Sequence, residues 1–349
     1  MSDETPVHKR RKRYRGRNPR KFEERYKELN PEKYPQDAEH IIAKGNTLAG
    51  SHRPICVAEI LEILNPQPGE VALDATLGYG GHSAVILPKI LPGGRLFGVD
   101  VDSIELPRTE ARMRSMGFDQ EAFIARKMSF SAVRGLLYEA GGGFDLIVAD
   151  LGVSSMQLDN PARGFSHKSE GPLDLRLTPQ KGKSASELIA TLSAEELERI
   201  LSENADEPHA RIIAQAILAS PEPPATTLEL ADIVQRRIKK IRPSLTEKDL
   251  KSTLQRTFMA LRIEVNQEFD ALERFLSVLP KCMNPGARAA VLTFHSGEDR
   301  RVKRAFAKGY QTGLYQKVAS NPIRPSAQER RSNPRSSCAK LRWAIRAEL

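Results

Sequence analysis

A glycine-rich turn between an apolar run and a helical pattern constrains the fold of this chain most strongly. The apolar residues Val71–Leu73 lead into Asp74, and Gly78, Gly80 and Gly81 follow shortly after. Glycines at such a turn let the backbone pass close to a ligand, and the N-terminus of the next helix offers free N–H donors. This stretch therefore predicts a strand, a ligand-binding turn and a helix at the start of an α/β domain.

A second apolar run ends in a carboxylate at a spacing that suits a nucleoside cofactor. Residues 95–99 are followed by Asp100, about 20 residues past the glycines, and an acidic side chain there suits a pair of ribose hydroxyls. The glycines do not follow the Gly-x-Gly-x-x-Gly pattern of dinucleotide-binding turns. The spacing therefore disfavours a NAD-dependent oxidoreductase.

Strand and helix patterns alternate between about residues 52 and 150. An amphipathic helix begins near residue 52 and is closed by Pro66. We expect strands at Val71–Ala75, Leu96–Asp100, Ala122–Ala125 and Phe144–Asp150, and helices at roughly 84–91, 103–116 and 130–140. Such alternation predicts a parallel sheet with helices on its faces.

The alternation stops after about residue 155, and no convincing strand pattern returns before about residue 260. Five helical patterns are predicted there, at 186–191, 194–203, 208–219, 228–240 and 247–262. A helical run (Val265–Leu279), a strand (Arg288–Phe294), a cation-rich helix (298–308) and a last strand (Lys340–Arg346) follow. We therefore predict a split α/β domain, with parts at 46–155 and 263–349, a helical substrate-recognition insertion at 156–262 and a disordered basic extension at 1–45.

The charge of the chain indicates a polyanionic partner. The net charge is +10 and the sequence pI is about 9.5. Three basic clusters stand out, at 9–21, 300–304 and 324–346, and solvated surface charge is the alternative explanation for each. Cys56, Cys282 and Cys338 are isolated, and no secretory signal or membrane-spanning run is visible. These features predict a cytoplasmic protein that binds RNA or DNA.

The fourth predicted strand delivers another carboxylate to the same edge of the sheet. Phe144–Asp150 runs directly into Leu151-Gly-Val-Ser154, and the carboxyl ends of strands are where ligands and substrates meet in such folds. An exocyclic amine conjugated to its ring is a poor nucleophile, and a hydrogen bond from its N–H to an oxygen helps to aim the lone pair. Asp150, a nearby backbone carbonyl or Ser154 could accept that bond.

Several short motifs together resemble one known family. They are Gly80–Ser83, Asp150–Asp159, Arg163–Ser166, Gly171–Arg176, Arg256–Phe258, Phe294–Arg300 and Asn333–Arg335. In this order and spacing, over roughly residues 50–347, they look like the bacterial MraW-type family of small-subunit ribosomal RNA cytosine-N4 methyltransferases. The resemblance implies the class I S-adenosylmethionine-dependent methyltransferase fold, which is a Rossmann-like, doubly wound sheet. It also implies S-adenosylmethionine as the methyl donor, no metal, and 16S rRNA of the small ribosomal subunit as the partner.

The resemblance also implies which residues contact the cofactor. They are Gly80, Gly81, His82, Asp100, Phe130, Asp150 and Gln157. Physical chemistry supports Asp100 for the ribose hydroxyls and Phe130 for the face of the adenine. Gln157 rests on the resemblance alone, and His82 is assigned a contact rather than a proton transfer. Asp150 and Ser154 are the candidates for orienting the cytosine amine, and direct in-line transfer of the methyl group is the expected reaction.

The segment Phe294–Arg300 has two interpretations. His295 and Ser296 could line the active cleft, with cations of the following helix on phosphate, or Ser296 could be an N-cap with Asp299 at the capping-box position. The chain also departs from the family pattern: Met156 replaces a usual proline, Gly297 replaces a usual leucine, and residues 206–209 replace a more basic stretch. The last departure puts RNA contacts of the insertion in doubt.

Two other functions compete with this prediction. A DNA amino-methyltransferase should carry a Ser/Asp/Asn-Pro-Pro-Tyr/Phe motif after the fourth strand, and Asp150-Leu-Gly-Val lacks both prolines. A non-catalytic RNA-binding ribosome-assembly factor should have lost Asp100 or the glycine turn, and both are present. The sequence therefore favours an RNA-modifying enzyme.

Overall fold

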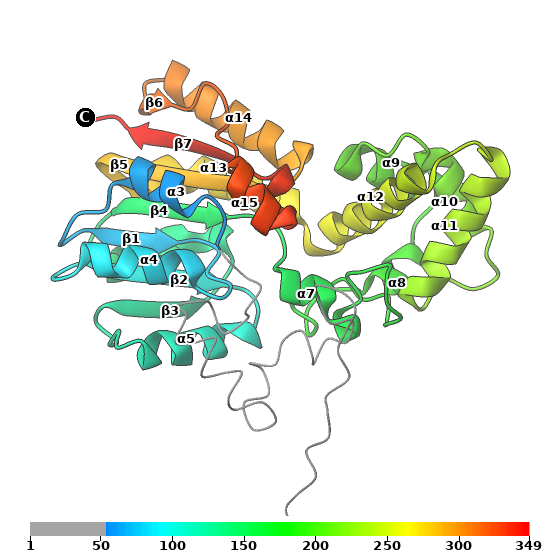
Figure 1. Ribbon diagram of the computed structural model, residues 1–349, viewed down its shortest axis with the longest axis horizontal. Coiled ribbons are helices and arrows are strands. Elements are labelled where there is room, and N and C mark those ends of the chain that lie inside the picture. The colour runs from blue at the N-terminus through cyan, green and yellow to red at the C-terminus, as the bar shows by residue number, and fades with distance from the viewer. Residues whose placement is uncertain (1–53, 349) are drawn as a thin grey trace, which may run out of the picture. The chain divides into compact units, whose positions relative to one another are not determined.

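Seven strands form one mixed sheet in the computed structural model, which describes residues 54–348 (Figure 1). Their order is β3-β2-β1-β4-β5-β7-β6. The strands are β1 (Val71–Asp74), β2 (Arg95–Asp100), β3 (Phe123–Lys127), β4 (Phe144–Asp150), β5 (Met283–Thr293), β6 (Tyr315–Val318) and β7 (Lys340–Arg346). Strands β1–β5 are parallel, and β7 is antiparallel to both β5 and β6. The predicted doubly wound α/β fold is confirmed. The predicted basic extension, 1–45, lies outside the described residues.

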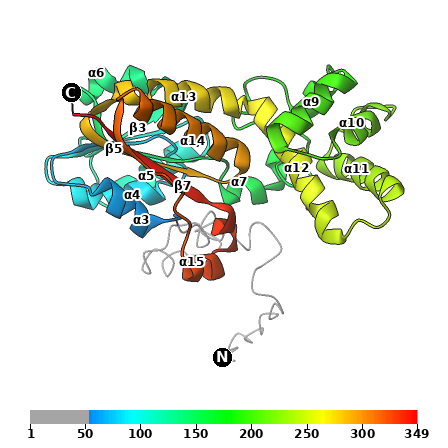
Figure 2. The same cartoon turned by 90° about the horizontal axis from the view of Figure 1, so that it is seen from above.

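Alternate residues of the central strands fill separate cores on the two faces of the sheet. In β4, Ile147 and Ala149 join the core beneath α13, whereas Leu146 and Val148 join the core beneath α3 and α4. This period of two is expected for a strand that is buried on both faces. The helices are α3 (Val57–Leu64), α4 (Gly81–Ile90), α5 (Glu105–Ser115), α13 (Glu268–Cys282) and α14 (Ser296–Gln311). Figure 2 shows α13 on one side of the sheet and α3 and α4 on the other.

All predicted strands are present, with ends shifted by a few residues. The largest shift is in β5, which begins at Met283 rather than 288. The segment 130–140 forms a 3₁₀-helix, η2 (Phe130–Leu136), and then a short α-helix, α6 (Leu137–Ala140). Strand β6 was not predicted, because its four residues at the sheet edge alternate too weakly between buried and exposed to give a signal.

Five helices between β4 and α13 form a bundle with its own core. They are α8 (Ala185–Ile189), α9 (Ala194–Ala205), α10 (Ala210–Leu218), α11 (Thr227–Ile241) and α12 (Glu247–Asn266). Their buried residues, together with three from the preceding loop, make a cluster that includes no residue of the sheet. Capping boxes at Ser184, Ser193 and Thr226 begin three of these helices. We call this bundle the helical insertion. No helix of the described residues is both long and apolar enough to cross a membrane.

Short elements complete the described chain around the ends of the strands. They are α7 (Ser155–Asp159), η3 (Pro161–Arg163), α15 (Ala327–Ser332) and η4 (Pro334–Cys338). None of them was predicted, because each has six residues or fewer and carries no helical period of apolar residues. Two of them, α7 and α15, approach the carboxyl ends of the strands, where the candidate site lies.

Candidate active site at the carboxyl edge of the sheet

Three neighbouring strands each end in an aspartate. Asp100 ends β2, Asp74 ends β1 and Asp150 ends β4, and these strands lie side by side in that order. Because they are parallel, their carboxyl ends meet at one edge, and the strand order reverses between β1 and β4. Ligands of doubly wound sheets bind at this switch point. The structure thus brings the predicted residues Asp100 and Asp150 to one edge, with Asp74 between them.

The glycine turn is fastened to this edge by hydrogen bonds. Gly78 and Gly80 have φ angles of 47° and 64°, in the left-handed region that glycine adopts readily. The N–H of Gly78 donates to Asp100 Oδ2 at 2.8 Å, and the Thr109 hydroxyl donates to the Gly78 carbonyl at 2.6 Å. A Cβ at Gly80 would lie 3.1 Å from Thr109 Cγ2. The turn therefore requires glycine both for its backbone conformation and for its tight packing.

Asp100 keeps acceptor capacity after satisfying its protein partners. Its Oδ1 accepts the N–H of Asp102 at 2.8 Å, and its Oδ2 accepts the N–H of Gly78. Burial raises the pKa of Asp100, and these two backbone hydrogen bonds oppose that rise. Each carboxylate oxygen can accept a second hydrogen bond. This geometry suits the two adjacent hydroxyls of a ribose.

A buried imidazole lies between the other two carboxylates. His82 is 5% exposed, in the first turn of α4, and its Nε2 is 3.5 Å from Asp150 Oδ2. Burial alone would lower the pKa of His82, but the direct contact with the Asp150 carboxylate, together with the charges of Asp150, Asp74 and Glu329, outweighs burial and raises it. Asp74 is 2% exposed and accepts the Ser83 hydroxyl at 2.7 Å. Burial raises the pKa of Asp74 too.

Three polar atoms of this cluster have no hydrogen-bond partner among the described residues. They are His82 Nδ1, Asp150 Oδ1 and His82 Nε2, all buried, and His82 Nε2 has only the 3.5 Å ion-pair contact with Asp150 Oδ2 described above. Buried polar atoms are nearly always paired in folded proteins, because leaving one unpaired costs about 1–3 kcal/mol. An unpaired set at a ligand-binding edge is therefore the arrangement expected of a site that a polar ligand completes.

A second network, which the sequence analysis missed, joins α7 and η3 to the loop after β2. Asp102 Oδ2 accepts from Gln157 Nε2 at 2.8 Å and from Arg163 Nη1 at 3.1 Å. Both members of the Asp102–Arg163 ion pair are buried. Burial alone would raise the pKa of Asp102, but the hydrogen bonds and the Arg163 charge lower it. Asp102 follows Asp100 by two positions, which was the only sequence signal for it.

Three predicted site residues have structural partners of their own. Ser154 Oγ accepts the N–H of Gln157 at 3.2 Å, and Gln157 Oε1 accepts the N–H of Ser154 at 2.8 Å. This pair is the capping box of α7. Phe130 begins η2, is half-buried and packs edge to face against Phe275, with ring centroids 5.4 Å apart. Any contact of these residues with a cofactor would add to these interactions.

The capping-box interpretation of Ser296 and Asp299 is wrong. Helix α14 begins at Ser296 itself, and its N-cap residue His295 makes no side-chain cap. Asp299 instead pairs with Arg342 at 2.6 Å and with Lys340 at 2.8 Å. Tertiary ion pairs have therefore replaced the local hydrogen bonds that the sequence pattern suggested.

Ser296 and Arg300 instead connect α14 to the helical insertion. Asp206 Oδ2 accepts from Ser296 Oγ and from Arg300 Nη2, each at 3.0 Å. Asp206 belongs to the acidic stretch that replaces a more basic family segment. Its carboxylate binds side chains of α14, so the acidic residue at this position has a structural role in this chain.

Cys56, Glu59 and Glu329 form a cluster beside the site whose potential ligand atoms all lie within 4.8 Å of one another. Burial, together with the charges of Glu329, Glu59 and Asp150, raises the pKa of the Cys56 thiol to about 12. Metals bind the thiolate rather than the thiol. The Cys56 N–H donates to Glu329 Oε1 at 3.0 Å. We therefore interpret the cluster as a structural contact between α3 and α15.

Comparison with known proteins agrees with this geometry. The sequence matches the MraW methylase family over residues 49–347. It is 49% identical over its full length to ribosomal RNA small subunit methyltransferase H 1 of Agathobacter rectalis, covering 100% of that protein. It is 47% identical to ribosomal RNA small subunit methyltransferase H 2 of Alkaliphilus metalliredigens, with 99% of this chain and 100% of that protein covered.

A more distant relative aligns over less of the chain. Ribosomal RNA small subunit methyltransferase H of Halorhodospira halophila is 38% identical over 87% of this chain and 97% of its own length. The family match itself begins at residue 49 and includes the glycine turn, all three strand-end aspartates and the helical insertion. The chain therefore belongs to the MraW methylase family, on a class I methyltransferase fold.

Proposed function

We propose that this protein transfers a methyl group from S-adenosylmethionine to the N4 amine of a cytidine in 16S rRNA of the small ribosomal subunit. The observation that carries the proposal is the edge formed by Asp74, Asp100 and Asp150, with unpaired polar atoms on Asp150 and His82. The names of the relatives, which are small-subunit rRNA methyltransferases, support RNA as the acceptor. The resemblance of the motifs supports cytosine N4 as the atom that is methylated.

The residues of this edge fit S-adenosylmethionine, which supplies an electrophilic methyl group when bound. The backbone at Gly80, Gly81 and His82 would face the methionine end, where the two glycines leave room and the start of α4 offers N–H donors. Asp100 would accept the ribose hydroxyls. Phe130 would cover one face of the adenine, and Gln157, already bonded to Asp102, would add a contact from α7.

Asp150 is the residue that we assign to the acceptor. Its Oδ1 is buried and unpaired, so it can accept an N–H from the cytosine amine and turn the nitrogen lone pair toward the methyl group. Ser154 would assist by placing this loop, since its Oγ already caps α7. Most of the rate would come from positioning, because a sulfonium methyl group needs no strong base for its transfer. The amine proton can leave after the transfer, when the product is more acidic.

The acceptor base must leave its stack to reach this edge. Sequence-specific recognition of RNA usually targets unstacked bases, and enzymes that modify a base take it from a single strand or flip it out of a helix. Arg300, Lys340 and Arg342 of the basic clusters are engaged in ion pairs, so the exposed cations Lys303, Arg304, Arg330 and Arg331 would hold the flanking phosphates in the cytoplasmic enzyme–subunit complex.

The decisive experiment is methyl transfer from labelled S-adenosylmethionine to small subunits isolated from a strain that lacks this protein. Wild type is compared with Asp100→Ala and with Asp119→Ala, a control that removes an exposed aspartate elsewhere in the same domain. Digestion of the RNA to nucleosides identifies the product. We expect N4-methylcytidine with wild type and the control, and none above background with Asp100→Ala.

Other outcomes would replace the proposal. A different methylated nucleoside would show that the acceptor atom is not cytosine N4. Cofactor binding without transfer to subunits or to rRNA would favour a non-catalytic assembly factor or another nucleic acid as substrate. Full activity of Asp100→Ala would remove Asp100 from the cofactor site.

A further inference from the structure

The helical insertion carries a basic segment that the three clusters found in the sequence do not include. Five of the seven residues from 236 to 242 are lysine or arginine, at the end of α11. Buried Val234 and Ile238 fix the rotation of this helix. Ile233, Arg236, Arg237 and Lys240 then follow the spacing of a single helix face.

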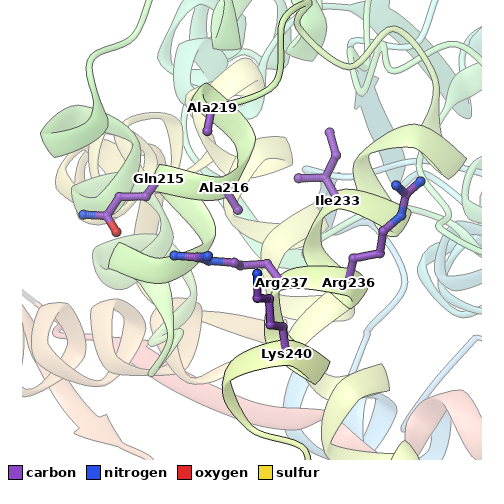
Figure 3. Close-up of a pocket in the computed structure, with 7 residues that line it drawn as sticks. All are labelled: Gln215, Ala216, Ala219, Ile233, Arg236, Arg237 and Lys240. Carbon is purple, nitrogen blue, oxygen red and sulfur yellow. The ribbon is translucent and has the colours of Figure 1, made fainter.

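This face of α11 borders a groove of about 420 Å³ against α10. Gln215, Ala216 and Ala219 form the α10 side, and Ile233, Arg236, Arg237 and Lys240 form the α11 side (Figure 3). The two alanines leave room that larger side chains would fill. The groove therefore has a small, largely apolar floor and a rim of three cations.

Two of the three rim cations are available to an anion. Arg236 forms an ion pair with Asp232, one turn earlier on the same helix. Arg237 and Lys240 form no ion pair with any described residue, and Arg237 Nε is buried without a hydrogen-bond partner. Figure 3 shows the side chains of Arg237 and Lys240 beside one another at the groove. A half-buried guanidinium with an unpaired N–H is the feature here that an anionic ligand would complete.

We propose that this groove binds the RNA substrate, taking one unpaired nucleotide and its flanking phosphates. Arg237 and Lys240 would contact the phosphates, and the floor of Ala216, Ala219 and Ile233 would contact the base or ribose. Guanidinium groups both pair with phosphates and stack on bases, which suits a groove of this composition. The inference rests on the proposed function, since the acceptor RNA is the polyanion that this chain would meet.

The test compares two charge-reversed variants that are matched in residue type. Arg237→Glu/Lys240→Glu alters the groove, and Arg274→Glu/Lys281→Glu alters exposed cations of α13 in the sheet domain. Binding to a 16S rRNA transcript is measured by filter retention at several salt concentrations. For the groove variant we expect affinity at least about tenfold weaker and a log–log salt slope shallower by about 1.5, because two phosphate contacts are lost. The α13 variant should change the slope by much less.

Controls separate loss of binding from loss of folding. The milder variant Arg237→Gln/Lys240→Gln should shift the slope in the same direction, and S-adenosylmethionine affinity should be unchanged in both groove variants. Unchanged RNA affinity and slope in a groove variant that still binds cofactor would overturn the inference. If wild type binds the transcript but transfers no methyl group, the proposed function fails while the groove result still stands.

A crosslinking measurement distinguishes RNA from protein as the occupant. A photoreactive probe on Ala219→Cys, in a Cys338→Ser background because Cys338 is an exposed free cysteine, is activated in the complex with small subunits. Crosslinks to rRNA are expected. Crosslinks to ribosomal protein alone would overturn the assignment to RNA.

Discussion

The charged groups at the carboxyl edge of the sheet are buried or half-buried, whereas most of those at the groove of the helical insertion are exposed to solvent. At the edge, Asp74 and His82 are almost fully buried; burial raises the pKa of Asp74, and neighbouring carboxylates raise the pKa of His82. At the groove, Arg236 and Lys240 are exposed on a helix face, beside the half-buried Arg237. The first region fixes a few groups at specific positions, as the chemistry of methyl transfer requires. The second region presents long cationic side chains at the surface, which suits the backbone of a nucleic acid.

The largest expected effect comes from breaking a buried ion pair at the edge. Arg163→Met should lower the free energy of unfolding by about 3–5 kcal/mol, because the Asp102 carboxylate would stay buried without its cation. The matched control is Arg199→Met, which removes an exposed cation paired with Glu203 on the insertion and should cost about 0.5 kcal/mol or less. Urea unfolding measures both variants. Equal losses of unfolding free energy in the two variants would show that the buried ion pair stabilises the protein no more than the exposed one does.

A smaller effect, on rate rather than stability, is expected at Asp150. Asp150→Asn keeps the size of the side chain but removes its charge and can present an N–H where an acceptor is needed. We expect methyl transfer at saturating cofactor to slow by about 100-fold, a typical loss for one electrostatic contact in an active site. Single-turnover kinetics measure the step directly. An unchanged rate would move the orienting role to another acceptor.

The same variant should change the titration of His82. Asp150 helps to raise the pKa of His82, so Asp150→Asn should lower that pKa toward the ordinary value of about 6.5. In wild type, the stability that this protonation contributes is complete below that ordinary pKa and is lost as the pH rises through the raised value. NMR titration of the imidazole measures the shift. A pKa of His82 that stays raised would mean that Asp74 or Glu329 dominates.

Packing beside the edge should show an intermediate effect on stability. Gly297 stands where the family usually has leucine, and a Cβ there would lie 2.5 Å from Phe269 Cζ. Arg301 covers the Phe269 ring at 3.5 Å, so the ring cannot move away freely. Gly297→Ala should cost about 1–3 kcal/mol, as overpacking usually does. Gly135→Ala, where a Cβ meets nothing within 4 Å, is the control, and thermal unfolding compares the two.

The smallest effect is expected where the helical insertion contacts α14 of the sheet domain. Asp206 is exposed and contacts Ser296 and Arg300, so Asp206→Ala should lower the free energy of unfolding by less than about 1 kcal/mol. The loss should shrink further in 1 M salt, because exposed charges are screened. Glu203→Ala is the control. A loss above 2 kcal/mol would mean that this contact holds the insertion to α14 much more firmly than an exposed ion pair can.

The sequence predicted the strands and the strand-end residues well because each depends on local pattern. Apolar runs ending in Asp100 and Asp150 define both a strand and the position of its last side chain, and parallel strands bring those ends together. The resemblance to the family, with its motifs in order, added the remaining site candidates. These parts of the fold and site require no knowledge of distant contacts.

The parts that could not be predicted depend on tertiary contacts. The Asp102–Arg163 pair joins residues 61 positions apart, and nothing in either segment indicates the other. The N-cap prediction for Ser296 was wrong because Asp206, from the insertion, bonds its hydroxyl. The groove depends on which residues of α10 face α11. A binding role for the cations from 236 to 242 can therefore be inferred only once the packing of the two helices is known.

The contact between Cys56 and Glu329 also bears on how the enzyme is made. It joins residues 273 positions apart, and the Glu329 charge reaches His82 at the cofactor edge. Strand β7, which pairs with the long central strand β5, comes later still in the chain. During synthesis, the edge therefore gains these neighbours only after Glu329 and β7 have been made, long after Asp74, Asp100 and Asp150.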